Sequence, residues 1–538
     1  MQDSILDTTD PTRPDDTVME KAQAGKHHAS EPSQTESVVC SSSPDLERGT
    51  MEESVSPGNG LLGYMLRLEI ALGFEVRGID RVPEALRERR TVFADYLQMS
   101  VIWFSSNITA NNLLLGLLGP LLFEVGLVDG MILGAFGAML GAMCAGYTST
   151  FGPLSGCRTM VASRYTMGWW PNKICVLLNL VIELGYGLID ALMAGQILSA
   201  VNGSGMSVVV GVIIASVIVL IVCCFGIKVF HIYERYAFIP QLVVLFVLIG
   251  VSGPYWFVDS PTVGDAPVRH ADRMSFFFLC VSGSLAWAPS GADFYVYFPA
   301  NAQRWKVFLS TTMGLGLSCA MTYMIGVGIA SGALQQASWN DAYEVSIGSL
   351  LVETYKPLGN FGDFCVVVVA LGLIGNNVPT IYSAGLNFQM LGGWCAAIPR
   401  VIWTLVAVII YTVCACVGRN KLFDIFESFL ALIGYWAIMW VTILLEEEFL
   451  FRRTNGHARW YDWSAWNDRS KMPLGLAAFT AFCIGWVGAV LGMYQTYFTG
   501  PLAKTVGYGI DMGIPVSCSW AAVLYPGLRW AELKYFGR

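Results

Sequence analysis

Twelve separate apolar segments, most of them more than about 20 residues long, dominate this chain of 538 residues. A helix needs about 20 mostly apolar residues to cross the hydrocarbon core of a bilayer. Only 13% of the residues are charged, roughly half the usual share in a soluble protein. We therefore predict an all-α integral membrane protein. The predicted spans are 94–121, 125–149, 172–200, 207–228, 235–254, 274–298, 307–332, 362–391, 398–418, 424–446, 473–498 and 510–528.

Basic residues are distributed unevenly between the predicted loops. If the N-terminus is cytoplasmic, the outer loops contain six of the 32 Lys and Arg residues, and the other 26 lie on the inner side. Cytoplasmic loops of membrane proteins carry such an excess. Because an even number of spans returns the chain to its starting side, we expect both termini in the cytoplasm. The six outer residues are Arg269, Arg273, Lys356, Arg419, Lys421 and Lys504.

Composition divides the chain into four predicted regions. Residues 1–65 are rich in Ser, Thr, Pro, Asp and Glu, which is typical of a disordered tail, and they lack the pattern of a signal peptide. Residues 66–93 form a cytoplasmic segment before the first span. Residues 94–446 contain the first ten spans. Residues 447–538 contain a cytoplasmic loop, two further spans and a short C-terminal tail.

Several functional classes lack the residues that they require. The five histidines lie outside the apolar spans and the 14 cysteines include no CxxC pair, so the spans contain no obvious metal site. No nucleophile–histidine arrangement in the spans indicates an enzyme. No basic tract indicates a nucleic-acid partner. We expect no cofactor, no enzymatic activity, and a lipid bilayer as the surroundings of most of the chain.

Polar residues interrupt the first and sixth spans. The first contains a run of Ser, Thr and Asn from Ser105 to Asn112, and the sixth contains Pro289 and Gly291, which we expect to break the helix. Paired interruptions in corresponding helices of two halves point to the central site of a transporter. Their places, first and sixth, suit two inverted five-helix repeats. The alternative is two ordinary helices with polar stripes that pack against neighbours.

The third span carries two acids. Glu183 and Asp190 lie seven residues apart, two turns, on one face of a helix that also carries Tyr186. An acid inside a membrane is costly and is a functional hypothesis by default. The alternative for either residue is a structural acid that is hydrogen-bonded to another helix.

The eighth span carries two adjacent amides. Asn376 and Asn377 precede Pro379 in an otherwise apolar run. Proline cannot donate a backbone hydrogen bond and disturbs the preceding turn, so we expect a helix break at Pro379 and amides that project into a cavity. The alternative is that both amides only bond a neighbouring helix.

Five short stretches occur in a specific order between about residues 70 and 530. With them, the chain resembles the purine–cytosine permeases of the nucleobase–cation symporter-1 family, the fungal branch in particular. The stretches are Gly78-Ile79-Asp80-Arg81-Val82-Pro83, Gly152-Pro153-Leu154-Ser155-Gly156, Ala292-Asp293-Phe294-Tyr295-Val296-Tyr297, Asn376-Asn377-Val378-Pro379 and Leu432-Ile433-Gly434-Tyr435-Trp436.

The resemblance implies a five-plus-five inverted-repeat, LeuT-like core over 94–446, with two helices added at the C-terminal end. It implies alternating access around a site between helices one, three, six and eight. It also implies a proton-coupled plasma-membrane symporter that imports a nucleobase-like heterocycle.

The resemblance also implies a set of substrate-binding residues. Tyr186 and Trp287 match the family's aromatic positions in the third and sixth helices, and stacking is worth roughly 1–3 kcal/mol per base. Amides can pair with the edge of a base through two hydrogen bonds. Together with Ser105 of the first helix, the predicted substrate-binding residues are Tyr186, Asp190, Trp287, Asn376 and Asn377.

The chain departs from the family at two of these positions. Asp190 stands where the family usually has an amide, and Tyr186 where it often has Trp. A carboxylate only accepts hydrogen bonds, so Asp190 favours a donor-rich or cationic ring such as an aminopyrimidine. The alternative is that Asp190 is protonated in one state and carries the coupling proton, a role for which Glu183 is the second candidate.

Residues 366–375 of the eighth span contain no hydroxyl side chain. In sodium-coupled relatives, hydroxyls in this stretch help to bind the ion, which needs several oxygen ligands. We therefore expect proton coupling. Two alternatives remain for the function: a permease for a vitamin B6-like compound or a specialised-metabolite precursor, and a nutrient receptor that kept the fold without transporting.

Overall fold

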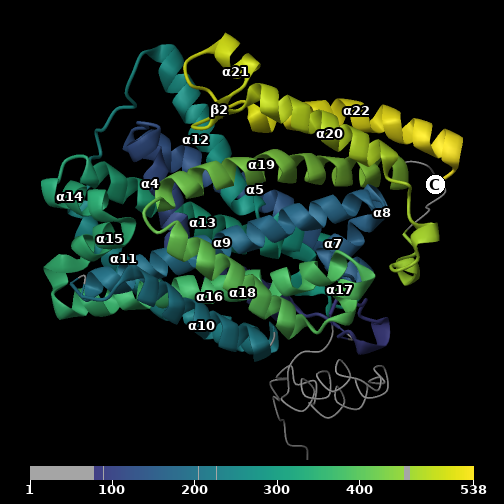
Figure 1. Ribbon diagram of the computed structural model, residues 1–538, viewed down its shortest axis with the longest axis horizontal. Coiled ribbons are helices and arrows are strands. Elements are labelled where there is room, and N and C mark those ends of the chain that lie inside the picture. The colour runs from purple at the N-terminus through teal and green to yellow at the C-terminus, as the bar shows by residue number, and fades with distance from the viewer. Residues whose placement is uncertain (1–77, 89, 204, 226, 454–460) are drawn as a thin grey trace, which may run out of the picture. The chain divides into compact units, whose positions relative to one another are not determined.

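The computed structural model describes residues 78–88, 90–203, 205–225, 227–453 and 461–538. The predicted tail, 1–65, lies outside the described residues, as does the first part of the predicted segment 66–93. Helices make up nearly all of the described structure (Figure 1). The only sheet in these ranges is a two-stranded antiparallel hairpin.

The first half of the core begins with a broken helix. Its two parts, α3 (Phe93–Asn107) and α4 (Ala110–Leu122), meet at an angle of 61°. The other elements of this half are η1 (Glu84–Leu86), α5 (Leu127–Ser149), α6 (Phe151–Ser155), α7 (Thr159–Ala162), α8 (Arg164–Met167), α9 (Pro171–Val201), α10 (Val208–Phe225), α11 (Ile227–Ser252) and η2 (Gly253–Tyr255).

The second half also begins with an interrupted helix. The α-helix α12 (Ala266–Leu285) ends in mid-span and continues as a 3-10 helix, η3 (Ala288–Tyr295). The following elements are α13 (Arg304–Ala333), α14 (Ala337–Val345), α15 (Ile347–Tyr355), η4 (Lys356–Leu358), α16 (Asn360–Met390), α17 (Gly393–Ala397), α18 (Arg400–Val417) and α19 (Leu422–Glu446).

The C-terminal region adds two long helices to this core. They are α20 (Leu476–Gly492) and α22 (Gly513–Phe536), which pack against each other, and α22 also packs against α19. The remaining elements are η5 (Glu447–Arg452), η6 (Trp463–Ala465), η7 (Arg469–Lys471), β1 (Tyr494–Gln495), β2 (Phe498–Thr499) and α21 (Pro501–Val506).

Helices occupy all twelve predicted segments. Eight helices in the described ranges are long and apolar enough to cross a membrane, and the bent pair α3–α4 adds a ninth. Two shorter apolar helices cover Val208–Cys223 and Leu476–Gly492. The number of twelve crossings therefore stays a prediction, whereas these helices establish a multi-pass helical architecture.

Large apolar side chains project outward along several of these helices. On α5, Ile132 and Phe136 are 51% and 69% exposed, and they lie one turn apart on one face. The opposite face of α5 carries buried small residues such as Gly134 and Ala138, and it packs against α12 and α13. Small residues let helices approach closely in a membrane, and the exposed apolar face suits lipid.

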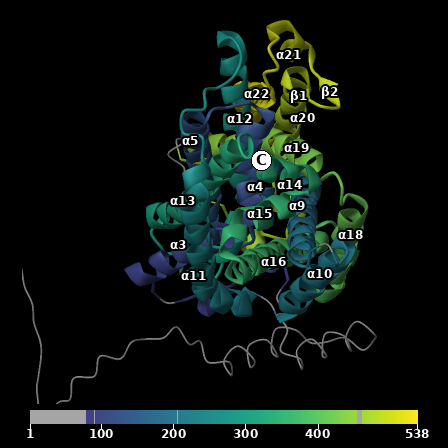
Figure 2. The same ribbon diagram turned by 90° about the vertical axis from the view of Figure 1, so that its left-hand side faces the viewer.

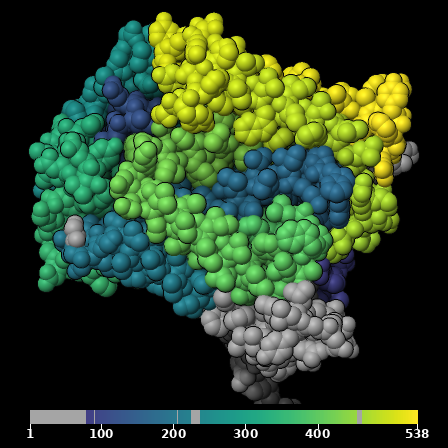
Figure 3. All heavy atoms as spheres, in the orientation of Figure 1, coloured from purple at the N-terminus to yellow at the C-terminus, as the bar shows by residue number. Residues whose placement is uncertain are grey.

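The arrangement places α9 between α18 and α19 on the face shown in Figures 1 and 3. At one end of the molecule, α14 and α15 form a short helical pair, and α15 contacts α9 and α16 (Figure 2). The helices α9 and α16 pack along each other, so residues of the third and eighth predicted spans face one another.

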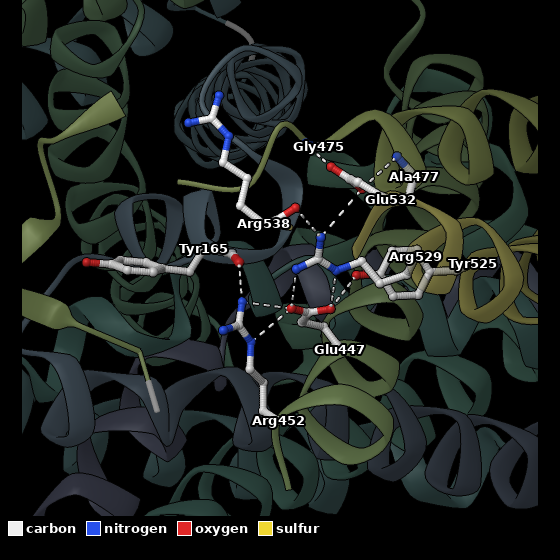
Figure 4. A network of polar contacts seen from close by, with 9 residues as sticks. All are labelled: Tyr165, Glu447, Arg452, Gly475, Ala477, Tyr525, Arg529, Glu532 and Arg538. Atoms are coloured by element: carbon white, nitrogen blue, oxygen red, sulfur yellow. Dashed lines mark hydrogen bonds and ion pairs between the residues drawn. The ribbon is translucent and has the colours of Figure 1, made fainter. Parts of the chain in front are cut away.

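A buried ion-pair network joins the end of α19 to α22 (Figure 4). The Glu447 carboxylate accepts hydrogen bonds from Arg529 Nε at 2.9 Å, Tyr525 Oη at 2.8 Å and Arg452 Nε at 2.9 Å. Glu532 accepts from two backbone amides at the start of α20 and pairs with Arg529 at 3.5 Å. The network therefore ties α19, α20 and α22 together through buried charges.

Candidate functional site

Side chains satisfy the backbone where α3 gives way to α4. The Asn107 amide donates to Trp103 O at 3.0 Å, and the Asn112 amide donates to Asn107 O at 2.7 Å. The Thr109 hydroxyl donates to Asn111 Oδ1 at 2.5 Å. Backbone freed at membrane depth must be satisfied by protein or by a polar cavity. The polar run that interrupts the first span therefore stabilises its break.

The interruption of the sixth span follows α12 and begins just before Pro289. The backbone amide of Ala292 donates to the Thr159 hydroxyl at 2.9 Å, so α7 supplies an acceptor to the 3-10 segment. Gly291 lies against α5: a Cβ atom there would be 2.7 Å from Thr148 Oγ1 and 2.8 Å from Ala145 O. Pro289 and Gly291 thus occur where the predicted break is found, and Gly291 allows the close contact with α5.

The helix α16 is continuous through Pro379, and the predicted helix break at this residue is wrong. A proline removes one backbone donor, and in a packed membrane helix the neighbours can satisfy the carbonyl that it frees. All residues from Val378 to Gly385 are buried, so packing on every side keeps the helix intact.

Asn376 connects α16 to the break between α3 and α4. Its amide nitrogen donates to Ser106 O, and its Oδ1 accepts from the Asn111 amide at 3.3 Å. Both contacts join residues more than 260 positions apart in the chain. The two halves of the core therefore meet at an amide–amide contact beside the interrupted helix.

A small cavity lies where α4, α9, α12 and α16 meet. Four predicted site residues line it: Glu183, Tyr186, Trp287 and Asn376. Its volume of about 20 Å³ is room for about one water molecule. A planar heterocycle is larger, so binding one here requires side chains to move. The other polar residues of the lining are Asn107, Asn111, Asn112, Asn179, Ser290, Thr380 and Ser383.

The two aromatic residues of the cavity are each held by a second ring. Trp287 makes an edge-to-face contact with Trp103, with ring centroids 5.6 Å apart. Tyr186 makes a similar contact with Phe429 at 5.5 Å, and its hydroxyl donates to Gly283 O at 3.4 Å. Both side chains remain partly exposed to the cavity. They can therefore present flat apolar surfaces to a ring.

Glu183 is buried and is surrounded by donors. Asn387 Nδ2 lies 2.8 Å from both carboxylate oxygens, Asn179 Nδ2 lies 3.1 Å from Oε1, and the Ser290 hydroxyl lies 3.4 Å from Oε1. The carboxylate thus contacts α9, α16 and η3 at once. No Lys or Arg in the described ranges pairs with it, so its partners within the protein are amides and a hydroxyl.

Asp190 is also buried, but its carboxyl group is not surrounded by hydrogen-bond donors as that of Glu183 is. It is 1% exposed, and neither carboxyl oxygen accepts a hydrogen bond of ordinary geometry from a described residue. Asn111 is close enough to interact with the carboxyl. Asp190 therefore lies near Asn111 but outside the cavity lining.

Two other predicted residues also lie outside the cavity lining. The Asn377 amide donates to Gly187 O at 3.2 Å, which bonds α16 to α9. The Ser105 hydroxyl is buried and meets no described hydrogen-bond partner. For Ser105, Asp190 and Asn377, direct contact with substrate stays a prediction.

Reasoning from the sequence missed Asn179 and Asn387. Asn387 follows Asn376 by eleven residues, about three helical turns, so both lie on the same face of α16. Asn179 precedes Glu183 by one turn. Helical spacing from the residues already chosen would have identified both. No group of three or more His, Cys, Asp and Glu that could hold a metal ion occurs among the described residues.

A family profile described as "Permease for cytosine/purines, uracil, thiamine, allantoin" matches residues 82–510. The vitamin B6 transporter TPN1 of Saccharomyces cerevisiae is 32% identical over 517 residues, which cover 87% of this chain and 89% of the relative. The purine-cytosine permease fcyB of Emericella nidulans is 32% identical over 488 residues, 90% of this chain and 94% of the relative.

Solved structures share the fold. Mhp1, a nucleobase-cation-symport-1 family transporter in a closed conformation with bromovinylhydantoin bound, superposes with a TM-score of 0.64 and 13% identity over 85% of this chain and 95% of its own. Inward-facing Mhp1 gives 0.62 at 14% identity, covering 86% of this chain and 96% of its own. The predicted helical membrane fold with a LeuT-like core is confirmed.

Proposed function

This chain belongs to the family of permeases for cytosine and purines, uracil, thiamine and allantoin, and it is therefore a multi-pass membrane permease and not an enzyme. We propose that it imports a nucleobase or a related small heterocycle by proton symport. The proposed transport is secondary and uses alternating access. The proposed location is the plasma membrane, with both termini in the cytoplasm.

The observation that supports this proposal most directly is the lining of the central cavity. Two aromatic rings, Tyr186 and Trp287, and the amide of Asn376 meet there beside the interruptions of two helices. Aromatic faces suit a planar ring, and an amide suits its polar edge. A buried site of this kind rejects rings that leave its polar groups unpaired.

Glu183 supports proton coupling in this proposal. It is a buried carboxylate in the cavity lining, and its partners belong to α16 and η3 as well as to its own helix. Gain or loss of a proton there changes hydrogen bonds to three elements together. Asp190 is the second candidate carrier, because its carboxyl is buried without an ordinary hydrogen bond from a described residue.

A vitamin B6-like substrate is the second candidate function. The similarity to TPN1 equals that to fcyB in percentage identity, and Asp190 adds an acceptor near the cavity where the family has an amide. A pyridine ring with several donors would suit such a site.

The experiment that separates these possibilities is uptake into cells that lack their own permeases. Labelled cytosine is competed with a panel of purines, pyrimidines and pyridoxine, and a protonophore is then added. We expect accumulation of one class of heterocycle against its gradient, and collapse of that accumulation with the protonophore. Sodium dependence at fixed pH would contradict proton coupling, and binding without accumulation would favour a receptor.

A further inference from the structure

A second cavity, much larger than the central one, lies beside the ends of α4, α12 and α19. Its volume is about 570 Å³. The connection between α20 and α22, including β1 and β2, forms one wall. We call it the acidic cavity, defined by Asp272, Ser282, Glu427, Tyr435, Gln495 and Asp511.

Its most distinctive feature is a set of hydrogen-bond acceptors without donors. The carboxyl groups of Asp272 and Glu427 are partly buried, and they accept no hydrogen bond and form no ion pair with any described residue. Gln495 is only 7% exposed, and its Oε1 has no hydrogen-bond donor among the described residues. No Lys or Arg of the described part of the chain lines the cavity. Carboxylates with no cation of the protein beside them fit a ligand that donates hydrogen bonds or carries a positive charge.

The third acid, Asp511, has a different role. Its carboxylate accepts hydrogen bonds from Gln495 Nε2 at 2.6 Å, from the Gly513 amide at 2.8 Å and from the Tyr435 hydroxyl. Asp511 therefore fixes the side-chain amide of Gln495, which forms part of the cavity wall. It also lies close enough to Glu427 to interact with it electrostatically.

The acidic cavity and the central cavity share a wall. Ser282 lines the acidic cavity and the next residue, Gly283, lines the central one. Glu427 and Tyr435 lie two turns apart on the α19 face that borders the acidic cavity. The α4–α5 and α20–α22 connections near this cavity are predicted outer loops. The acidic cavity thus lies on the predicted outer side of the central one.

We propose that the acidic cavity is a second binding site, which receives planar heterocycles that are cationic or rich in hydrogen-bond donors before they reach the central cavity. The carboxylates of Asp272 and Glu427 accept hydrogen bonds from the ring substituents. The exposed rings of Tyr494 and Tyr508 border the same space and attract a cation through their faces. The role in uptake rests on the proposed function, whereas binding itself does not.

The test uses the full chain, purified in lipid nanodiscs, with two labelled probes: thiamine, a permanent cation, and uracil, a neutral ring. Trp287→Ala, which removes an aromatic face of the central cavity, serves as the background. In this background we expect thiamine to bind, and the pair Asp272→Asn and Glu427→Gln to weaken binding about tenfold, as for the loss of a hydrogen bond to a charged group.

The matched control is Asp424→Asn, one turn before Glu427 on α19 but outside the cavity. We expect it to leave thiamine binding within about twofold. Glu427→Gln alone, with a smaller loss, covers the case in which the double variant does not fold. Equal thiamine binding with and without the cavity acids, or an equal loss in the Asp424→Asn control, would overturn the proposal.

Failure of this inference is distinguishable from failure of the proposed function. If the cells accumulate no heterocycle while thiamine binding still depends on Asp272 and Glu427, the proposed function fails and the second site stands. If labelled cytosine is accumulated normally while thiamine binding is unchanged by substitution of Asp272 and Glu427, only the proposal of a second site fails.

Discussion

The side-chain nitrogen of Asn387 lies 2.8 Å from each of the two carboxylate oxygens of Glu183. This contact joins α9 to α16, and the Ser290 hydroxyl adds η3 on the same carboxylate. The group that could carry a proton is therefore held by the interrupted helix of the second half and by the long helix α16. A change in its charge alters contacts on both sides of the central cavity.

Replacing this carboxylate with an amide tests the coupling role. In Glu183→Gln, size is kept but no proton can be exchanged, so we expect concentrative uptake to fall at least about tenfold while substrate affinity changes less. The pH dependence of the remaining uptake should be flatter. Asp363→Asn, an exposed acid near the start of α16, is the control. Unchanged accumulation in Glu183→Gln would exclude this carboxyl as the carrier.

Trp287 is expected to supply stacking energy. Removing its ring in Trp287→Ala should weaken substrate binding by roughly 1–3 kcal/mol, and Trp287→Phe should have a smaller effect. Trp305, which is 62% exposed on α13, provides a matched Trp→Ala control with little expected change. Competition binding in membranes measures all three. An equal loss at both tryptophans would argue against stacking at Trp287.

Asp190 is expected to set which rings are accepted. Asp190→Asn restores an amide that both donates and accepts, so we expect uptake to shift towards neutral purines and cytosine and away from cationic rings. The same competition panel measures the shift. A variant that reaches the cell surface and binds substrate unchanged, yet transports nothing, would instead favour Asp190 as the proton carrier.

The buried pair of Glu447 and Arg529 is expected to matter for stability. Removing one partner of a buried ion pair costs about 3–5 kcal/mol, because the other charge is left unpaired. Arg529→Met should therefore lower the unfolding temperature in detergent markedly, and adding Glu447→Gln should recover part of the loss. Lys356→Ala breaks a pair with Glu353 in which the Lys side chain is 70% exposed, and it should change the unfolding temperature little.

The tight contact at Gly291 can be tested against a glycine with space around it. Gly291→Ala places a Cβ within 2.8 Å of the Ala145 carbonyl oxygen, so backbone must move and we expect lower stability and reduced uptake. At Gly250 on α11, no described atom apart from the neighbouring backbone of the same helix lies within 4 Å of an added Cβ. Gly250→Ala should be neutral or stabilising by up to about 1 kcal/mol. Similar outcomes for the two variants would refute the packing role.

The sequence contained enough information to predict the helices and both interruptions. Pro289, Gly291 and the polar run after Ser105 are conspicuous in apolar surroundings, and the structure has its breaks there. The predicted helix break at Pro379 is wrong, because the local chemistry of proline favours a break whereas tertiary packing keeps α16 helical there. The predicted eleventh span, 473–498, runs into the hairpin, which begins at Tyr494.

The acidic cavity illustrates what sequence patterns do not contain. Asp272, Glu427 and Asp511 come from three distant segments, and only the packing of α12, α19 and the α20–α22 connection brings them together. Within one helix, spacing places residues on a shared face, as for Asn376 and Asn387. Between helices, the partners depend on crossing geometry that no local pattern encodes.

The hydrogen bond between Asn111 and Asn376 has a consequence for selectivity. At the small central cavity these two amides are already hydrogen-bonded to each other. A substrate that binds either amide must therefore compete with the other amide for it. A ring whose hydrogen bonds to these amides are weaker than the bond between Asn111 and Asn376 obtains no net binding energy from them. Discrimination would then begin with the energy needed to separate two side chains, before any contact with the solute is counted.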